Sequence, residues 1–282
     1  MCEYAKTFPF PSEKEMLEAW AYIVRQNREQ AERFREEPEG ADFYAPTASR
    51  FKASPISTAD AVINIISGML KPEDTLLDIG AGGGRYALPL AKRLGEVIAV
   101  EPSERMRSVL MEGMREYGIQ NIRVIDDRWP LNITLKADVV FISHVGYDIE
   151  DIGLFLNAME VSAGRLCVAV FRDGSPAASS YSFWPPIHGE KRVPLPSLKE
   201  FLTLQLSRQR LFEIRLIPQE KPDFANRDML VSFLRQQLFI KPEGEKDRKL
   251  IDLVEKVVEL RNGRFSLPSN SGWVGIVSWT TH

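Results

Sequence analysis

The sequence predicts an α/β fold in which a mostly parallel sheet carries helices on both faces. Three observations support this prediction. Short apolar runs alternate along the chain with segments of helical period, which is the pattern of parallel sheets. A glycine-rich turn follows the first apolar run, residues 76–79. The chain of 282 residues, 44% of them hydrophobic, is long enough for one large α/β domain with additions or for two small domains.

The expected strands and helices follow one another in chain order. The strands are expected at residues 76–79, 96–101, 121–125, 137–142, 165–171, 211–217 and 272–279. Segments of helical period lie at residues 58–70, 84–94, 151–159, 227–239 and 247–261. We therefore expect seven strands with helices between most of them.

Residues 1–41 are expected to form a helical extension that precedes the main domain, residues 42–282. Ser12 and Glu15 match the capping pattern that begins many helices. Apolar residues such as Trp20 then recur near helical spacing, so one face of the helix is apolar. Such a helix either lies on the main domain or serves as a lid or a dimerisation arm, and we favour the first.

Residues 78–84 carry the most informative motif, Asp-x-Gly-x-Gly-x-Gly, between a strand and a helix. Glycine allows a positive φ and lets a ligand lie directly on the backbone. The helix N-terminus that follows offers N–H groups to a carboxylate or phosphate. Residues 82–87 also fit the dinucleotide pattern G-x-G-x-x-G/A. Asp78, however, would be a poor neighbour for a diphosphate and a good neighbour for a ligand with an ammonium and a sulfonium. That ligand is S-adenosylmethionine.

On this motif the chain resembles the class I S-adenosylmethionine-dependent methyltransferases, whose first motif is an acidic residue followed by G-x-G-x-G. The resemblance implies a Rossmann-like sheet whose last strand inserts antiparallel beside the sixth. Glu101 follows Asp78 by 23 residues, at a strand end where a carboxylate can accept hydrogen bonds from both ribose hydroxyls. An NAD site uses an acid there too, and Glu101 with Pro102 also reads as a helix start.

The third strand also ends in acids. In the resembled family an acid at this point receives the adenine amino group, the next backbone N–H reaches a ring nitrogen, and an apolar side chain packs on the ring. Asp126 and Asp127 both stand there, and either could instead cap a helix; Trp129 could equally be a packing residue.

In many members the segment before the first core helix folds over the cofactor. Tyr44 and Arg50 are the candidates for that contact, with a packed aromatic and a surface arginine as the alternatives. The resemblance thus implies a site for S-adenosylmethionine and its product S-adenosylhomocysteine, lined by Asp78, Gly80, Ala81, Gly82, Gly84, Glu101, Pro102, Met106, Asp126, Asp127, Arg128, Trp129, Ser143, His144, Tyr44 and Arg50.

Methyl transfer is an in-line displacement, and a base is needed only when the acceptor must lose a proton. His144 follows the fourth strand next to the expected methyl position, so it is the candidate base. Tyr147 and Asp148 are nearby alternatives. A histidine that only packs beside the cofactor is the other interpretation of His144.

Two insertions, residues 172–196 and 221–267, are expected to cap the site and to set the substrate, because ligands of open α/β sheets bind at the carboxyl ends of the strands. The first insertion is rich in aromatic residues. Trp184, His188 and Glu190 could orient a substrate there, and a packed structural loop is the alternative.

The end of the fourth strand indicates the class of acceptor. Enzymes of this class that methylate exocyclic amines of bases, or a glutamine amide, carry Asn/Asp-Pro-Pro-Tyr/Phe at this point, whereas this chain has Ser-His-Val-Gly at residues 143–146. The Pro-Cys pair of cytosine C5 chemistry is absent as well. A small-molecule acceptor is therefore favoured, with protein or RNA acceptors behind it.

A regulatory protein that binds the cofactor without transferring a methyl group is a second hypothesis, and an NAD-dependent oxidoreductase is a third.

Composition restricts the partners. The net charge of −3 supplies no basic field for nucleic acid. Two cysteines and three histidines indicate neither a disulfide framework nor a metal site. No N-terminal signal pattern and no membrane-spanning apolar run is visible, so we expect a soluble, cytoplasmic protein that is a monomer or a homodimer.

Overall fold

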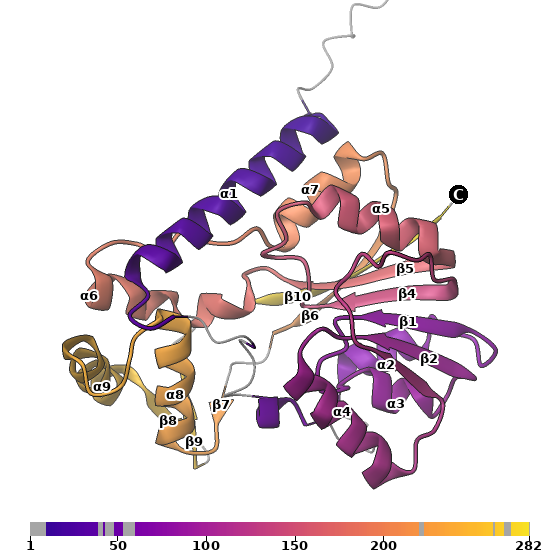
Figure 1. Ribbon diagram of the computed structural model, residues 1–282. Coiled ribbons are helices and arrows are strands. Elements are labelled where there is room, and N and C mark those ends of the chain that lie inside the picture. Colours follow the sequence, from indigo (N-terminus) through magenta and orange to yellow (C-terminus); the bar gives the residue numbers. More distant parts are fainter. Residues whose placement is uncertain are drawn as a thin grey trace, which may run out of the picture.

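The computed structural model describes residues 10–38, 42, 48–52, 60–219, 223–261, 263–267 and 272–281. Seven strands form one sheet in the order β3-β2-β1-β4-β5-β10-β6 (Figure 1). They are β1 (Thr75–Ile79), β2 (Glu96–Val100), β3 (Ile122–Ile125), β4 (Ala137–Ser143), β5 (Ala163–Arg172), β6 (Glu213–Pro218) and β10 (Trp273–Thr280). β10 alone is antiparallel to its neighbours and lies between β5 and β6. The predicted seven-stranded sheet, with its last strand antiparallel beside the sixth, is confirmed.

Each face of this sheet is covered by helices. Alternate side chains of a strand point to opposite faces, so Leu76 packs with α2 (Ala61–Ser67) and α3 (Ala87–Ala91) on one face, together with α4 (Glu104–Tyr117). Leu77 packs on the other face, where α5 (Ile152–Ser162) and α7 (Leu198–Ser207) lie. The central strands are buried on both faces, which is why they read as continuous apolar runs.

Helix boundaries follow from capping residues more than from apolar period. Asp60 accepts hydrogen bonds from Val62 N and Ile63 N and so begins α2. The helix expected at residues 84–94 is shorter because Gly84 has φ 87°, and α3 begins only at Ala87. The segment 247–261 is helical only to Val257, the last residue of α9.

The two expected insertions pack together as one unit, here called the cap: the described residues of 176–188 and 223–267. Its elements are η2 (Pro176–Phe183), α6 (Trp184–His188), β7 (Asp223–Phe224), α8 (Arg227–Leu238), α9 (Glu245–Val257), β8 (Glu259–Arg261) and β9 (Arg264–Ser266). The three short strands form a separate antiparallel sheet that the sequence did not predict. Phe183, Trp184 and Leu230 belong to one buried cluster, so both insertions share a core.

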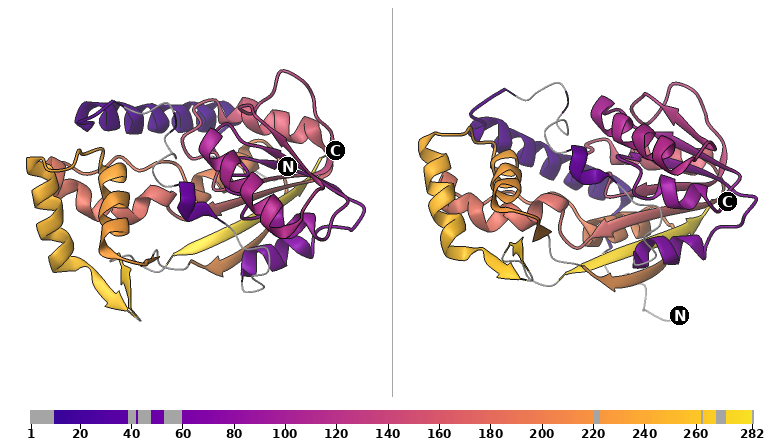
Figure 2. Two further views of the ribbon diagram at one scale, coloured as in Figure 1. Left: turned by 60° about the horizontal axis from the view of Figure 1, so that its bottom comes forward. Right: turned by 90° about the horizontal axis from the view of Figure 1, so that it is seen from below.

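The N-terminal helix α1 (Glu13–Phe34) joins the cap to the main sheet (Figure 2). Trp20 is buried in the core under α5 and α7, and its Nε1 donates to the carbonyl oxygen of Ile149 at 3.0 Å. Phe34, near the other end, packs on the cap core and lies edge-on to Trp184 with ring centroids 5.8 Å apart. The helix therefore lies on the main domain, as favoured from the sequence, and also contacts the cap.

The carboxyl ends of the parallel strands point toward the cap, whereas β10 runs the other way to the C-terminus (Figure 1). Along the described part of the chain, no helix combines the length and the apolar character needed to cross a membrane.

Candidate functional site

The turn after β1 depends on glycine. Gly80 has φ 73°, and its N–H donates to the carbonyl oxygen of Val100 at 2.8 Å, which ties the turn to the end of β2. A Cβ on Gly80 would lie 2.5 Å from Cγ2 of Val145, in the loop after β4. Gly82, by contrast, has open space where a Cβ would be, although its φ is 55°. The turn is therefore closely packed against β4 at Gly80 and open at Gly82, where a ligand can approach the backbone.

Glu101 follows β2 and holds this turn. Its Oε2 accepts a hydrogen bond from Gly82 N at 2.8 Å, and its Oε1 accepts one from Ser103 N at 2.8 Å. Burial raises the pKa of Glu101, and the two backbone donors oppose that shift. Each carboxylate oxygen has a second lone pair, so Glu101 can hold the turn and still accept hydrogen bonds from a ligand.

Asp78 lies one strand away, and its surroundings differ. Its side chain is 2% exposed, and Oδ2 has no hydrogen-bond partner among the described residues. Burial, followed by the charge of Glu101, raises the pKa of Asp78 to about 8. A buried polar group without a partner is costly. A ligand with an ammonium group would supply the missing donor and countercharge, which is the property inferred from the sequence motif.

The acids after β3 are exposed, and each has a local partner. Asp126 forms an ion pair with Arg107 at 2.7 Å, and Asp127 accepts from Arg128 N at 2.7 Å. Arg107 also donates to the Glu101 carbonyl oxygen at 2.9 Å, so it links the ends of β2 and β3.

Trp129 and Met106 are buried, whereas Pro102 is exposed. Nε1 of Trp129 donates to the Phe155 carbonyl oxygen at 3.3 Å, and the ring belongs to the core beneath α5. This favours the packing interpretation of Trp129. Tyr44 lies outside the described residues, as does the side chain of Arg50.

The end of β4 brings His144 and Tyr147 together. His144 has φ 57°, and its Nδ1 lies 3.4 Å from the Tyr147 hydroxyl. That hydroxyl also accepts from Arg172 N at 2.8 Å. Burial, then the charge of Arg172, lowers the pKa of His144 to about 3, so the ring is neutral at physiological pH. Burial raises the pKa of Tyr147, which makes its phenolate inaccessible.

Of the three aromatic-loop candidates, Trp184 and His188 lie in the cap and Glu190 follows it, and all three contact α1. Trp184 is 1% exposed inside the cap core. His188 Nε2 lies 2.9 Å from the Leu238 carbonyl oxygen, and Glu190 accepts from Gln30 of α1 at 2.7 Å. These contacts favour the packed structural alternative over substrate binding for Trp184, His188 and Glu190.

Three residues at the site were not singled out from the sequence. Asp42 accepts from Ser103 Oγ at 2.8 Å and from Arg105 N at 3.2 Å, beside Glu101. The hydroxyl of Tyr86 and Nε of Arg172 are buried without a hydrogen-bond partner in the described structure. The available sequence signal for Arg172 was a basic residue directly after a buried strand.

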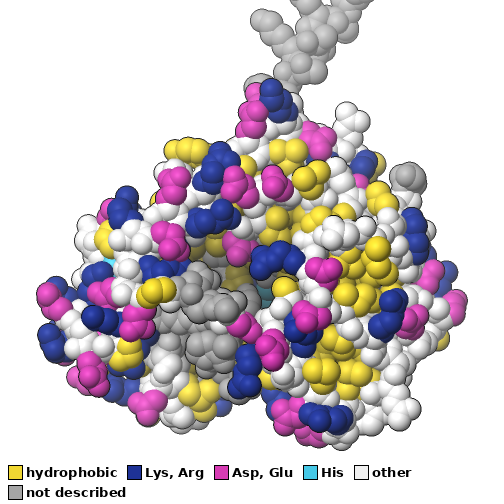
Figure 3. Space-filling model, in the orientation of Figure 1, with side chains coloured by type: hydrophobic (Ala, Val, Ile, Leu, Met, Phe, Trp, Pro, Cys, Tyr) yellow, Lys and Arg dark blue, Asp and Glu magenta, His cyan; other side chains and the backbone are white. Residues whose placement is uncertain are grey.

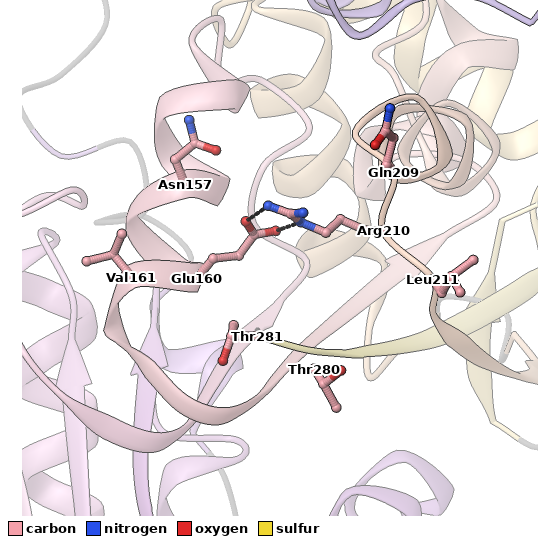
Figure 4. Close-up of a pocket in the computed structure, with 8 residues that line it drawn as sticks. All are labelled: Asn157, Glu160, Val161, Gln209, Arg210, Leu211, Thr280 and Thr281. Atoms are coloured by element: carbon pink, nitrogen blue, oxygen red, sulfur yellow. Dashed lines mark hydrogen bonds and ion pairs between the residues drawn. The ribbon is translucent and has the colours of Figure 1, made fainter.

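The surface is hollowed near the centre of the face shown in Figure 3, where a histidine lies below basic side chains. A separate pocket is lined by Asn157, Glu160, Arg210 and Thr281 (Figure 4). Thr280 also lines this pocket and pairs with Leu166 near the start of β5. The pocket therefore lies at the amino ends of the parallel strands, whereas the glycine turn lies at their carboxyl ends. Arg210 and Glu160 already form a two-hydrogen-bond ion pair there, at 3.0 and 2.8 Å.

Comparisons with known proteins agree with this geometry. Residues 76–160 match a family model described as a methyltransferase domain. The ribosomal RNA small subunit methyltransferase A of Thermotoga maritima is 24% identical over 196 residues, 70% of this chain and 59% of that protein. The protein of the same description from Desulforapulum autotrophicum is 29% identical over 91 residues, 31% of this chain and 32% of that one. The chain therefore spans less than two thirds of the length of these relatives.

Solved structures share the fold at low sequence identity. A putative methyltransferase from Bacillus halodurans C-125 superposes with a TM-score of 0.55 at 13% identity, over 80% of this chain and 99% of that one. Magnesium protoporphyrin IX methyltransferase from Synechocystis PCC 6803, solved with bound S-adenosylhomocysteine, gives 0.50 at 12% identity, over 95% and 99%. These two structures show a shared fold, and the match over residues 76–160 shows that the chain contains a methyltransferase domain with the glycine turn near its start.

Proposed function

We propose that the protein transfers the methyl group of S-adenosylmethionine to a small-molecule acceptor. The observation that carries this proposal is the buried Asp78 carboxyl beside a glycine turn and a second buried acid, Glu101; its Oδ2 has no hydrogen-bond partner among the residues described. An ammonium-bearing nucleoside fits all three features. A dinucleotide would place a diphosphate against Asp78, which is electrostatically unfavourable.

The residues have distinct tasks in this proposal. Asp78 pairs with the ammonium group, Glu101 accepts hydrogen bonds from the ribose hydroxyls, and the open backbone at Gly82 lies against the ligand. Bound there, S-adenosylmethionine supplies a sulfonium methyl group that an acceptor lone pair displaces in line, with S-adenosylhomocysteine leaving. The protein contributes alignment and exclusion of water.

His144 contacts the acceptor in this proposal. The Tyr147 hydroxyl accepts from Arg172 N, so its own proton is free to be donated to Nδ1 of His144. Nδ1 is thereby engaged, and Nε2 is the ring nitrogen available to an acceptor. Because the ring is neutral, His144 adds no positive charge that would repel the sulfonium.

Two observations favour a small acceptor. The cap lies on the side of the carboxyl ends of the strands (Figure 1), so it restricts access to the site. The segment Ser143–Gly146 lacks the Asn/Asp-Pro-Pro-aromatic sequence used to methylate base amines. The net charge of −3 also gives little attraction for a polyanion.

A second candidate is ribosomal RNA methylation. It is favoured by the two relatives described as ribosomal RNA small subunit methyltransferase A. Both matches cover less than two thirds of those proteins, so the parts that contact RNA there need not have counterparts here.

Calorimetry separates the cofactor hypotheses. S-Adenosylmethionine, S-adenosylhomocysteine and NAD would be titrated into the wild type and into Glu101→Ala. We expect micromolar binding of the two sulfur nucleosides, at least tenfold weaker in the variant. Binding of NAD alone, or of none of the three, would refute the cofactor assignment.

A transfer assay then identifies the acceptor class. S-Adenosylmethionine labelled in its methyl group would be incubated with the enzyme and with separated small-molecule, RNA and protein fractions of a cell extract. Label in the small-molecule fraction supports the proposal, and ribonuclease-sensitive label supports the RNA candidate. Cofactor binding with no transfer to any fraction would favour the regulatory hypothesis.

A further inference from the structure

The tasks proposed above for Asp78, Glu101 and His144 leave three buried polar atoms near the ends of β4 and β5 unused. They are Nε of Arg172, Oγ of Ser143 and the hydroxyl of Tyr86, and none has a hydrogen-bond partner within the described ranges. Leaving such groups buried and unpaired is costly. Their gathering at one place therefore suggests a ligand that pairs with them.

The strand register places the three groups on the same face of the sheet. Phe141 pairs with Val168, and Ser143 pairs with Val170, all four on the α3 side. Arg172 is the next residue in the alternation of β5, so its side chain leaves from that face too. Tyr86 lies edge-on to Phe141 on the same side, with ring centroids 5.2 Å apart. Burial raises the pKa of Tyr86, and the charge of Arg85, the Ser143 hydroxyl and the charge of Arg172 oppose that rise, so the Ser143 and Tyr86 hydroxyls are close neighbours although their geometry falls short of a hydrogen bond.

Arg172 brings a positive charge to this place. Within the described structure its guanidinium forms no ion pair, whereas neighbouring Arg85 is paired with Asp60 at 2.7 Å. The Asp173 carboxylate, whose Oδ1 would lie 2.6 Å from a Cβ on Gly272, acts on Arg172 through its charge but forms no ion pair with it among the described contacts. The backbone at Arg172 is fixed, because its N–H donates to the Tyr147 hydroxyl at 2.8 Å.

We propose, resting on the proposed function, that Arg172, Ser143 and Tyr86 bind an anionic group of the methyl acceptor, a carboxylate or a phosphate. A guanidinium binds either oxyanion through parallel hydrogen bonds, and the two hydroxyls can donate to the remaining lone pairs. The site adjoins His144 through Ser143, so an anion held by Arg172 fixes the acceptor beside the transferred methyl group. Acceptors that lack a negative charge are poor substrates.

The test uses S-adenosylhomocysteine-saturated protein and two probes, inorganic phosphate and acetate, at constant ionic strength set with chloride. Thermal melting of the wild type is expected to show a saturable rise with millimolar midpoint for one probe or both, and the stronger probe identifies the anion class. In Arg172→Met the midpoint is expected to weaken at least tenfold. The matched control is Arg123→Met, an exposed arginine on β3 paired with Glu96, which is expected to behave like the wild type.

Tyr86→Phe keeps the ring contact with Phe141 and removes only the unpaired hydroxyl. We expect its unliganded melting temperature to equal or exceed that of the wild type while its affinity for the anion falls several-fold. This variant tests anion binding at the site even if Arg172→Met fails to fold.

Three outcomes would overturn the inference. One is no anion response in the wild type, and another is an equal response in Arg172→Met. The third is a loss of S-adenosylhomocysteine affinity beyond tenfold in Arg172→Met, because Arg172 would then hold the carboxylate of the cofactor. Failure of the wild type to bind S-adenosylhomocysteine would instead refute the proposed function, and this inference with it.

Discussion

The carboxyl groups of Asp78 and Glu101 lie at the ends of neighbouring parallel strands, but the backbone supplies donors to only one of them. Glu101 accepts from Gly82 N and Ser103 N, whereas Oδ2 of Asp78 has no partner in the part of the chain described. The charge of Glu101 adds to burial in raising the pKa of Asp78 to about 8. Glu101 thus maintains the turn, and Asp78 is left to be neutralised by a proton or by a cationic ligand.

Ligand binding is therefore expected to release the proton of Asp78. Near pH 6.5 the unliganded carboxyl is protonated, and pairing with an ammonium group requires its ionised form. Calorimetric titration with S-adenosylhomocysteine in buffers of different ionisation enthalpy should show release of about one proton per ligand. Asp78→Asn should bind at least tenfold more weakly and release none. Equal proton release in the wild type and the variant would contradict this assignment.

The same carboxyl should make the unliganded protein less stable at high pH. Its native pKa of about 8 lies above the ordinary value of 3.8, so the native state holds a proton that the unfolded state releases. The stabilisation from this proton is complete below the ordinary value and is lost as pH rises through about 8. At pH 8.5, Asp78→Asn should melt at a higher temperature than the wild type. The control, Asp126→Asn, changes an exposed acid and should show no such gain.

Gly80 and Gly82 should respond differently to an added methyl group. Both have a positive φ, but only at Gly80 does a Cβ meet Val145, at 2.5 Å. We expect Gly80→Ala to lower the free energy of unfolding by about 2 kcal/mol or more, and Gly82→Ala by about 1 kcal/mol. Val145→Ala in the Gly80→Ala background should restore part of the loss. Chemical denaturation measures all four proteins, and no rescue would mean that φ alone limits Gly80.

Glu101→Gln tests the link between the turn and the ligand. The amide keeps one acceptor oxygen and loses the other, so either the turn or the ribose hydroxyls lose a partner. Affinity for S-adenosylhomocysteine should fall at least tenfold, about 1.4 kcal/mol. Glu104→Gln changes an exposed acid in the first turn of α4 and should leave the affinity within a factor of about two. Similar losses in both variants would point to a general charge effect.

His144 should influence turnover without appearing as a titrating group. Because its pKa is lowered to about 3, the ring stays neutral between pH 5 and 8. We expect His144→Gln to reduce kcat about tenfold while S-adenosylhomocysteine affinity changes little. A wild-type limb in kcat near pH 6.5 that disappears in the variant would show that the ring titrates in the complex.

The strands and the cofactor-binding turn could be predicted because their signals are local. A buried strand is an apolar run, and Asp78 is recognised from the glycines that follow it. Helix α3 was predicted too long because the helical spacing of apolar residues was read from Gly84 onward. The positive φ of Gly84 is incompatible with an α-helix at that residue. The small antiparallel sheet of the cap was missed because its strands are only two or three residues long.

Side chains whose role depends on distant partners could not be assigned from the sequence. Trp184 was a candidate for substrate contact, but it packs on Phe34, 150 residues earlier in the chain. Arg172 and Tyr86 are 86 residues apart and come to the same face of the sheet only through the register of β4 and β5 and the contact of Tyr86 with Phe141. No local pattern records such a register, so this part of the site emerged only from the fold.

The length of helix α1 sets the distance between its contact with the main domain and its contact with the cap. Trp20 and Phe34 are separated by 14 residues, close to four helical turns and about 21 Å along the axis. They therefore leave the helix on the same side, one into the core beneath the sheet and one into the cap. Deleting a single residue between them would turn Phe34 by about 100° relative to Trp20, with no change to either contact surface. The length of α1, in whole turns, is thus a determinant of where the cap stands over the ends of the strands.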